Sequence, residues 1–169
     1  MGNKLGTRNI IEGVSYYTPD VYTDFRGDLW TLWQKGKSGD FDLPYNHDKV
    51  STSRKNVLRG IHGDTKSHKL ITCLYGEIYF VTVDNRPDSN TYKKWDWEIL
   101  SDKNRTQVLL EPGIGNGFFV LSDMCVFHYK WFYDGKYPDV DDQFTIKWNN
   151  KKINIDWPID NPILQMRDK

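Results

Sequence analysis

The stretch that decides the fold class is MCVFHYKWFY, residues 124–133. In an extended strand successive side chains point to opposite faces, so Phe127, Tyr129 and Trp131 share one face and His128 lies on the other. A face made only of aromatic rings is stable when it is removed from water. We therefore predict a β-strand whose aromatic face points into the protein and whose His128 face points away from it.

The rest of the chain repeats such short apolar runs. They are WTLWQ (30–34), NVLRGIH (56–62), LITCLY (70–75), EIYFVTVD (77–84), WDWEIL (95–100), QVLLE (107–111) and GFFVL (117–121). Sequences rich in turn residues, such as GKSGD, NRPDSN and DGKYPD, separate them. Short strands with no long helical periodicity between them favour an all-β fold, an antiparallel jelly-roll sandwich or barrel.

The length and the C-terminal sequence predict one domain. A chain of 169 residues is long enough for one sizeable core, because folding at that length buries roughly 70% of the extended surface. No linker or internal repeat interrupts residues 1–169. The tail 148–169 contains prolines and is predicted to be an irregular segment laid over the barrel.

Charge and hydropathy argue against several classes of partner. Lys and Arg total 23 against 23 Asp and Glu, so no global field draws the chain to nucleic acid or to an anionic membrane. No segment reaches the roughly 18 apolar residues of a membrane-spanning helix, and the N-terminus lacks an apolar signal sequence. A soluble, cytoplasmic protein is expected, with Cys73 and Cys125 as buried free thiols.

The segment VLRGIHGDTKSHKL (57–70) holds several side chains that a packed strand does not need, namely Arg59, His62 and Lys69. His62 could bind a metal, transfer a proton or sit in a core. A metal site in a small β-barrel commonly uses two histidines separated by one residue, whereas His62 is followed by Gly63. We therefore expect neither a metal nor another cofactor.

Proton transfer is the remaining chemical role for His62. A neutral imidazole, with an unperturbed pKa of about 6.5, accepts a proton near neutral pH. Lys69 and Arg59 suit a developing enolate or a phosphate, although each taken singly is better explained as a solvated surface cation. Strand parity places Arg59 and His62 on opposite faces, so both reach one pocket only if the strand is bulged. Gly60 between them allows such a bulge.

Two other patterns bear on chemistry. GIGNGF (113–118) has the wrong spacing for a dinucleotide-binding loop and no helix follows it, so we predict a β-turn loop there. No Ser or Cys stands in a nucleophile elbow such as G-x-S-x-G. The hydroxyl of Tyr129 needs a partner on its buried face. That partner is a substrate if the barrel encloses a pocket, or a backbone carbonyl if it does not.

A series of motifs runs along the chain: VLRGIH with a following KL, YGEIYFVTVD, EPGIGNGFFVLSD, FHYK, IDWP and PILQMRD. Their order and spacing resemble those of the dTDP-4-dehydrorhamnose 3,5-epimerase family of cupin-like jelly rolls. The likeness extends from DFRGDLW (24–30) to Asp168. It implies a cupin-type fold and a metal-free, homodimeric epimerase. Its substrate is a 4-keto-6-deoxy sugar on a nucleoside diphosphate, whose ketone acidifies the hydrogens at C3 and C5.

The resemblance implies catalytic roles for four residues. His62 matches the general base, and Asp168 in the final RD matches the carboxylate that pairs with it. Lys69 matches the lysine near the 4-keto oxygen, and Tyr129 matches the acid that returns a proton from the opposite face of the ring. These residue types fit the chemistry, because inversion by proton exchange needs a base, an acid and a group that stabilises the enolate.

The resemblance also implies binding residues and reveals departures. Arg59 and Arg26 match arginines that contact the nucleotide, one of them reaching across the dimer. The family usually has a His where this chain has Asn116, and an aromatic residue and Gln where it has Gly63 and Asp64. These departures resemble epimerases that act on GDP-linked 6-deoxy-4-keto-heptoses in bacterial capsule biosynthesis. They place Asn116 among the substrate-binding residues.

Together these features predict a homodimeric 3-epimerase or 3,5-epimerase of a GDP-4-keto-6-deoxy-heptose. The alternative is a substrate linked to dTDP instead of GDP. No nucleic acid or membrane partner is expected. Two other functions stay open: a 3,4-ketoisomerase, which moves the carbonyl instead, and a cupin that binds nucleotide sugars without catalysis.

Overall fold

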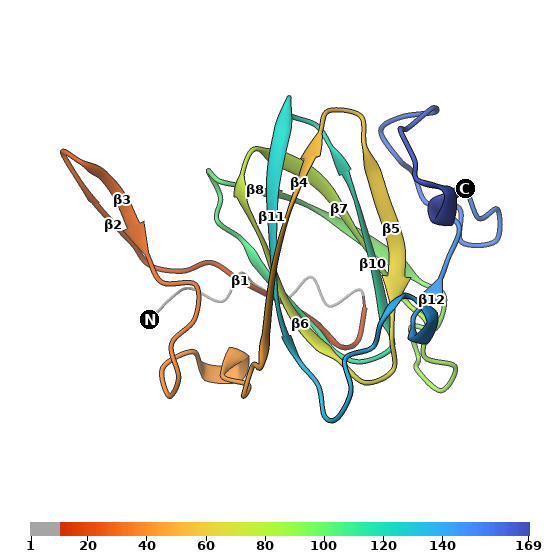
Figure 1. The fold of residues 1–169 in the computed structure, drawn as a ribbon, viewed down its shortest axis with the longest axis horizontal. Coiled ribbons are helices and arrows are strands. Elements are labelled where there is room, and N and C mark those ends of the chain that lie inside the picture. Colours follow the sequence, from red (N-terminus) through yellow and green to blue (C-terminus); the bar gives the residue numbers. More distant parts are fainter. Residues whose placement is uncertain (1–10) are drawn as a thin grey trace.

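The computed structural model describes residues 11–169, which form two facing antiparallel sheets (Figure 1). In spatial order the first, the β11 sheet, consists of β1 (Val14–Tyr17), β9 (Gln107–Leu110), β6 (His68–Tyr75), β11 (Met124–Phe132) and β4 (His47–Arg54). The second, the β5 sheet, consists of β12 (Phe144–Thr145), β5 (Leu58–Gly63), β10 (Ile114–Val120), β7 (Glu77–Asp84) and β8 (Trp95–Ser101). The all-β jelly-roll prediction is confirmed.

Short elements complete the fold. A hairpin of β2 (Val21–Asp24) and β3 (Gly27–Trp30) projects from one side of the sandwich (Figure 1). The 3-10 helices are η1 (Gly39–Phe41), η2 (Val140–Asp142) and η3 (Met166–Asp168). Among the described residues, no helix is long and apolar enough to cross a membrane.

The main core lies between the sheets and contains the aromatic face of β11. Phe127 is buried and stacks on Phe118 of the opposite sheet, with ring centroids 4.4 Å apart. Tyr129 packs against this core, while His128 faces outward and contacts Asp48 at 2.5 Å. The predicted alternation along residues 124–133 is therefore confirmed. Cys73 and Cys125 are buried free thiols, also as predicted.

The C-terminal segment covers the outer face of the β5 sheet (Figure 1). Trp157 packs in a cluster with Leu58 and Val81, and the indole N–H of Trp157 donates to the carbonyl of Trp148 at 2.8 Å. The prediction of irregular chain over the barrel is confirmed. This cover brings η3, at the end of the chain, next to β5.

Two predictions of local structure were wrong. WTLWQ (30–34) is not a strand; β3 ends at Trp30, and the loop after it lies over the outer face of the β11 sheet. GIGNGF (113–118) was predicted to be a turn, but Ile114–Val120 form β10. Its glycines serve close packing, since a Cβ at Gly117 would come within 2.9 Å of the Arg59 carbonyl oxygen.

Buried Asp84 gives a test of how pH affects stability. Burial alone would raise the pKa of this carboxyl, but hydrogen bonds from Arg86, Ser89 and Thr91 outweigh it and lower the pKa to about 2. A carboxyl with a lowered pKa stabilises the fold above its unfolded pKa, and this contribution is lost as pH falls through the folded value. We expect Asp84→Asn to lower the free energy of unfolding by about 2 kcal/mol at neutral pH.

Urea unfolding at a series of pH values measures this effect. The difference between wild type and Asp84→Asn is expected to shrink as pH falls from about 4 towards 2. A difference that stays constant across that range would contradict the account of Asp84.

Candidate active site

A cavity of about 250 Å³ lies between the two sheets. It is lined by residues from both sheets, from the loop after β11 and from η3. The residues that line it are Lys49, Ser51, Arg59, Gly60, His62, Lys69, Ile71, Asn116, Phe118, Phe127, Tyr129, Trp131, Tyr137, Asp139, Val140, Gln143, Gln165 and Arg167. Polar groups converge here on an otherwise aromatic wall, which is typical of a small-molecule site.

His62 and Asp168 form a close pair in this cavity. His62 Nε2 lies 2.7 Å from Asp168 Oδ1, although the two are not aligned as a hydrogen bond. The Asp168 side chain is fully buried, and that of His62 is 19% exposed. A buried carboxylate at this distance stabilises an imidazolium. Because Nε2 faces Asp168, Nδ1 is the nitrogen that can take a proton from a substrate.

A bulge in β5 brings Arg59 and His62 to the same cavity. On β10, Asn116 pairs with His62 and Phe118 pairs with Arg59, so β5 has one more residue than β10 between the two pairs. Gly60 lies in the bulge with φ of +100°, a conformation that favours glycine, and a Cβ there would come within 2.6 Å of the Asn116 carbonyl oxygen. The bulge predicted at Gly60 is confirmed.

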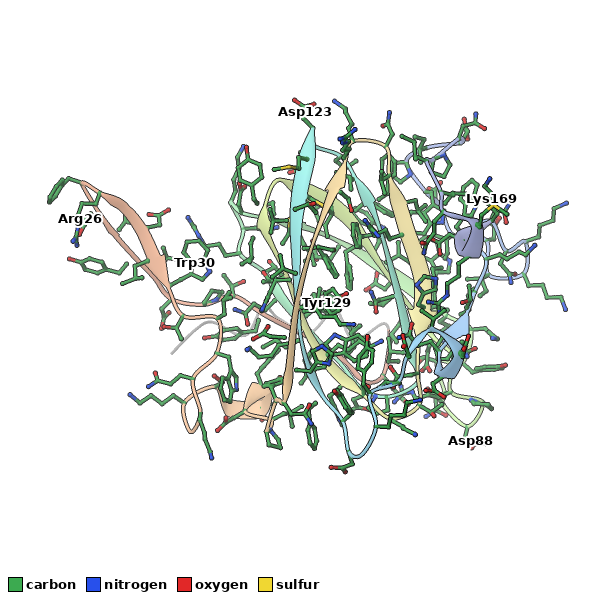
Figure 2. The ribbon with its side chains drawn as sticks, viewed as in Figure 1. Arg26, Trp30, Asp88, Asp123, Tyr129 and Lys169 are labelled. Atoms are coloured by element: carbon green, nitrogen blue, oxygen red, sulfur yellow. The ribbon has the colours of Figure 1, made fainter. Side chains whose placement is uncertain are left out.

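Tyr129 enters the cavity from the β11 sheet, opposite the sheet that carries His62 (Figure 2). Burial raises the pKa of its phenol, and nearby Lys49 and Arg59 only partly oppose this effect. The hydroxyl therefore stays protonated at neutral pH and can donate a proton. Its partner can be a ligand, since Tyr129 lines an open pocket rather than a closed core.

Lys69 lies on β6, beside β11, with its side chain 6% exposed. Its Nζ is 3.3 Å from Asp64 Oδ2 and 4.4 Å from the centroid of the Trp131 ring. Burial lowers the pKa of this ammonium, and Asp64 opposes the shift. A cation in this position can stabilise negative charge that develops on a ligand oxygen.

The other predicted binding residues divide into two groups. Arg59 and Asn116 line the cavity, and Arg59 Nε also donates to Ser53 Oγ at 2.8 Å. Arg26 instead lies at the tip of the β2–β3 hairpin, away from the cavity of its own chain, and pairs with Asp24 at 2.6 Å (Figure 2). Every other predicted site residue either lines this cavity or, in the case of Asp168, contacts His62; Arg26 does neither.

The departures Gly63 and Asp64 do not line the cavity either. Both lie at the end of β5, and a Cβ at Gly63 would come within 2.4 Å of the Phe144 ring. The sequence predicts only that these two residues fall near the sugar or nucleotide pocket, and Asp64 does contact Lys69, which lines the cavity. Of the departures from the family pattern, Asn116 alone lines the pocket.

Sequence reasoning missed several cavity residues. Lys49 lies on β4, whose alternating polar sequence HDKVSTSR was not recognised as a strand, and its Nζ donates to the Tyr137 hydroxyl at 2.5 Å. Arg167 precedes Asp168, so the quoted PILQMRD motif already contained it. Its guanidinium contacts Gln143 Oε1 at 3.2 Å, which ties η3 to the loop after β11.

Within residues 11–169 no group of three or more His, Cys, Asp or Glu side chains is arranged to hold a metal ion. The absence of a metal from the reaction stays a prediction. The site residues described here can supply a proton acceptor, a proton donor and a cation within one cavity.

Comparison with known proteins identifies the family. Residues 8–169 match the family model described as dTDP-4-dehydrorhamnose 3,5-epimerase. The enzyme of that name from Escherichia coli K12 is 35% identical over 157 residues, covering 89% of this chain and 83% of the relative. A dTDP-4-dehydrorhamnose 3-epimerase from Streptomyces niveus is 33% identical over 165 residues, covering 94% of this chain and 78% of the relative.

Solved structures agree with the sequence comparison. The Legionella pneumophila dTDP-6-deoxy-D-glucose-3,5-epimerase in complex with dTDP-4-keto-L-rhamnose has a TM-score of 0.88 at 32% identity, covering 99% of this chain and 90% of that one. A Streptomyces bikiniensis 3'-monoepimerase in complex with dTDP-quinovose has a TM-score of 0.85 at 27% identity, covering 94% and 82%. The chain therefore belongs to the dTDP-4-dehydrorhamnose 3,5-epimerase family, and it is an isomerase of the nucleotide-sugar epimerase class.

Proposed function

We propose that this enzyme inverts C3, with or without C5, of a 4-keto-6-deoxy sugar carried on a nucleoside diphosphate. One observation carries the proposal: His62 and Tyr129 enter the same cavity from opposite sheets. A sugar ring bound between the sheets would thus present one face to a base and the other to an acid. Proton exchange through these two groups inverts a carbon.

In this mechanism His62, backed by Asp168, removes the hydrogen at C3. The electrons move to the 4-keto oxygen and give an enolate, whose charge the Lys69 ammonium stabilises. Tyr129 then donates its proton to C3 from the opposite face, which restores the ketone with inverted configuration. His62, Lys69 and Tyr129 line the cavity, and Asp168 contacts His62.

For the substrate we propose a GDP-4-keto-6-deoxy-heptose of the kind used in capsular polysaccharide biosynthesis. Its support is Asn116, the departure from the family pattern that lines the cavity. The second candidate is a dTDP-linked 4-keto-6-deoxy hexose, which is favoured by the names of the relatives. The expected cytoplasmic location stays a prediction.

Parallel incubations separate these substrates. Purified enzyme is incubated with the GDP-heptose and with the dTDP-hexose in deuterated water, and kcat/KM for deuterium incorporation is compared. A higher value with the GDP-heptose supports the first candidate, and a higher value with the dTDP-hexose supports the second. A product whose carbonyl has moved to C3 would identify a 3,4-ketoisomerase.

We also propose a homodimer in which Arg26 reaches the partner's cavity. The hairpin that carries Arg26 projects from the sandwich and exposes hydrophobic side chains, with Phe25 97% and Leu29 71% exposed. At its base Arg105 pairs with Asp28 and lies over the Trp30 ring, which holds the arm against the sandwich. An exposed apolar arm of this kind suits contact with a second copy.

Mixing two impaired variants, assayed at a substrate concentration below the wild-type KM, tests the exchange of Arg26. We expect Arg26→Ala to raise KM by about tenfold, as the loss of a charged hydrogen-bond donor does. Heterodimers of Arg26→Ala with His62→Ala contain one cavity with both residues intact if Arg26 acts across the interface. Activity above that of either homodimer is the expected result. No recovery in a mixture shown to contain heterodimers would contradict it.

A further inference from the structure

Asp64 is a buried carboxylate that the mechanism above does not use. Its residue is 3% exposed, although Asp is rarely buried without a partner. The two carboxylate oxygens have different partners. Oδ1 accepts the backbone N–H groups of Lys66 at 2.9 Å and Ser67 at 2.6 Å, and Oδ2 lies 3.3 Å from Lys69 Nζ. One oxygen therefore fixes the β5–β6 turn and the other faces the cavity's cation.

The backbone around Asp64 holds the carboxylate in place. The Asp64 carbonyl accepts the N–H of Gly113 at 2.7 Å, which ties the turn to the loop before β10. Gly63 just before it packs so closely that a Cβ would come within 2.7 Å of the Ile114 carbonyl oxygen.

Asp64 favours the charged form of Lys69. Its ammonium is buried, and burial lowers its pKa; Asp64 opposes that shift, whereas Arg167 adds to it. Other titratable side chains that share the cavity wall with Lys69 are Lys49, Arg59, His62, Tyr129, Tyr137 and Asp139. Asp64 is the carboxylate in direct contact with the ammonium. The Trp131 ring on β11 is the other group in contact, with its centroid 4.4 Å from Nζ, so the charged partner of the ammonium is Asp64.

We propose that Asp64 is a positioning residue that keeps the Lys69 ammonium charged and aimed into the cavity. The part of this inference that concerns the enolate rests on the proposed function. The pairing itself does not, because it concerns two side chains of the free enzyme. Asp64 has no contact with the cavity and acts only through Lys69.

A substrate-free titration tests the pairing. The Lys69 side-chain signal is followed by NMR from neutral to alkaline pH and assigned with Lys69→Arg. In Asp64→Asn the turn keeps an oxygen acceptor and Lys69 loses its negative partner, so its titration is expected to move to lower pH. Asp123→Asn removes the same charge from an exposed residue and is expected to leave the titration unchanged. An unchanged Lys69 titration in Asp64→Asn would overturn the inference.

The pH profile of activity tests the functional part. In Asp64→Asn the loss of kcat/KM is expected to grow as pH rises, because a larger share of Lys69 becomes neutral. Asp64→Ala is expected to shift the alkaline limb in the same direction and also to lower Tm, since the turn loses its acceptor. A merely structural Asp64 would lower Tm and reduce activity equally at every pH, which would overturn the role. Absence of deuterium exchange in the wild type would instead overturn the proposed function, and the Lys69 titration would still decide the pairing.

Discussion

His62→Asn is expected to reduce deuterium incorporation at C3 by at least about 10²–10⁴-fold, the usual contribution of a general base. Asn keeps a polar side chain of similar size but accepts no proton at neutral pH. The pairing of His62 with buried Asp168 supports this expectation, because the carboxylate stabilises the imidazolium that forms when the proton moves. Incorporation is measured by NMR of the sugar after incubation in deuterated water.

His128→Asn is the matched control. His128 also contacts an aspartate through Nε2, at 2.5 Å from Asp48 Oδ1, but it lies on the outer face of the β11 sheet. His128→Asn removes a His–Asp pair like that of His62, but on the outer face of the sheet and not in the cavity. This variant is expected to retain exchange at C3. Wild-type exchange in folded His62→Asn would remove His62 from its role as the base.

Tyr129→Phe is expected to separate deprotonation from inversion. His62 and Lys69 remain in the variant, so exchange at C3 can continue on the face of the base. Delivery of a proton from the opposite face is lost, and formation of the inverted product should fall by about 10²–10⁴-fold. The ratio of exchanged substrate to epimerised product, read from one NMR time course, reports both processes.

Tyr79→Phe provides the control for loss of a phenol. The Tyr79 hydroxyl donates to the Asp156 carbonyl at 2.9 Å under the C-terminal segment, far from the chemistry of the cavity. We expect this variant to epimerise normally. Equal amounts of inverted product from Tyr129→Phe and from wild type would show that another group supplies the proton.

The sequence predicted those features that local periodicity or a motif determines. The alternation in residues 124–133 placed Tyr129 inside, and the need for Arg59 and His62 to share a pocket predicted the bulge at Gly60. Both depend on a few neighbouring residues. The final RD motif likewise indicated Asp168. A family motif can identify the partner of His62 at the far end of the chain without knowledge of the fold.

The missed features depend on contacts between distant segments. The sequence of β4, HDKVSTSR, is almost entirely polar, so it lacks the apolar runs by which the other strands were recognised. The glycines of β10 look like turn residues until the backbone of β5 is packed against them. The sequence places Asp64 only near the sugar or nucleotide pocket. The direction of its carboxylate is set by the Lys66 and Ser67 N–H groups, which only the folded turn brings together.

Everything proposed for this cavity depends on exchange of the proton at C3 of a nucleotide-linked 4-keto-6-deoxy sugar. The most direct test is one incubation of the wild-type enzyme with the GDP-4-keto-6-deoxy-heptose in deuterated water, followed by a count of the labelled carbons. The account predicts deuterium at C3, with or without C5, and inversion at each centre that the enzyme epimerises. Saturable binding with no deuterium at either carbon, found both for this sugar and for the dTDP-linked hexose, would contradict it.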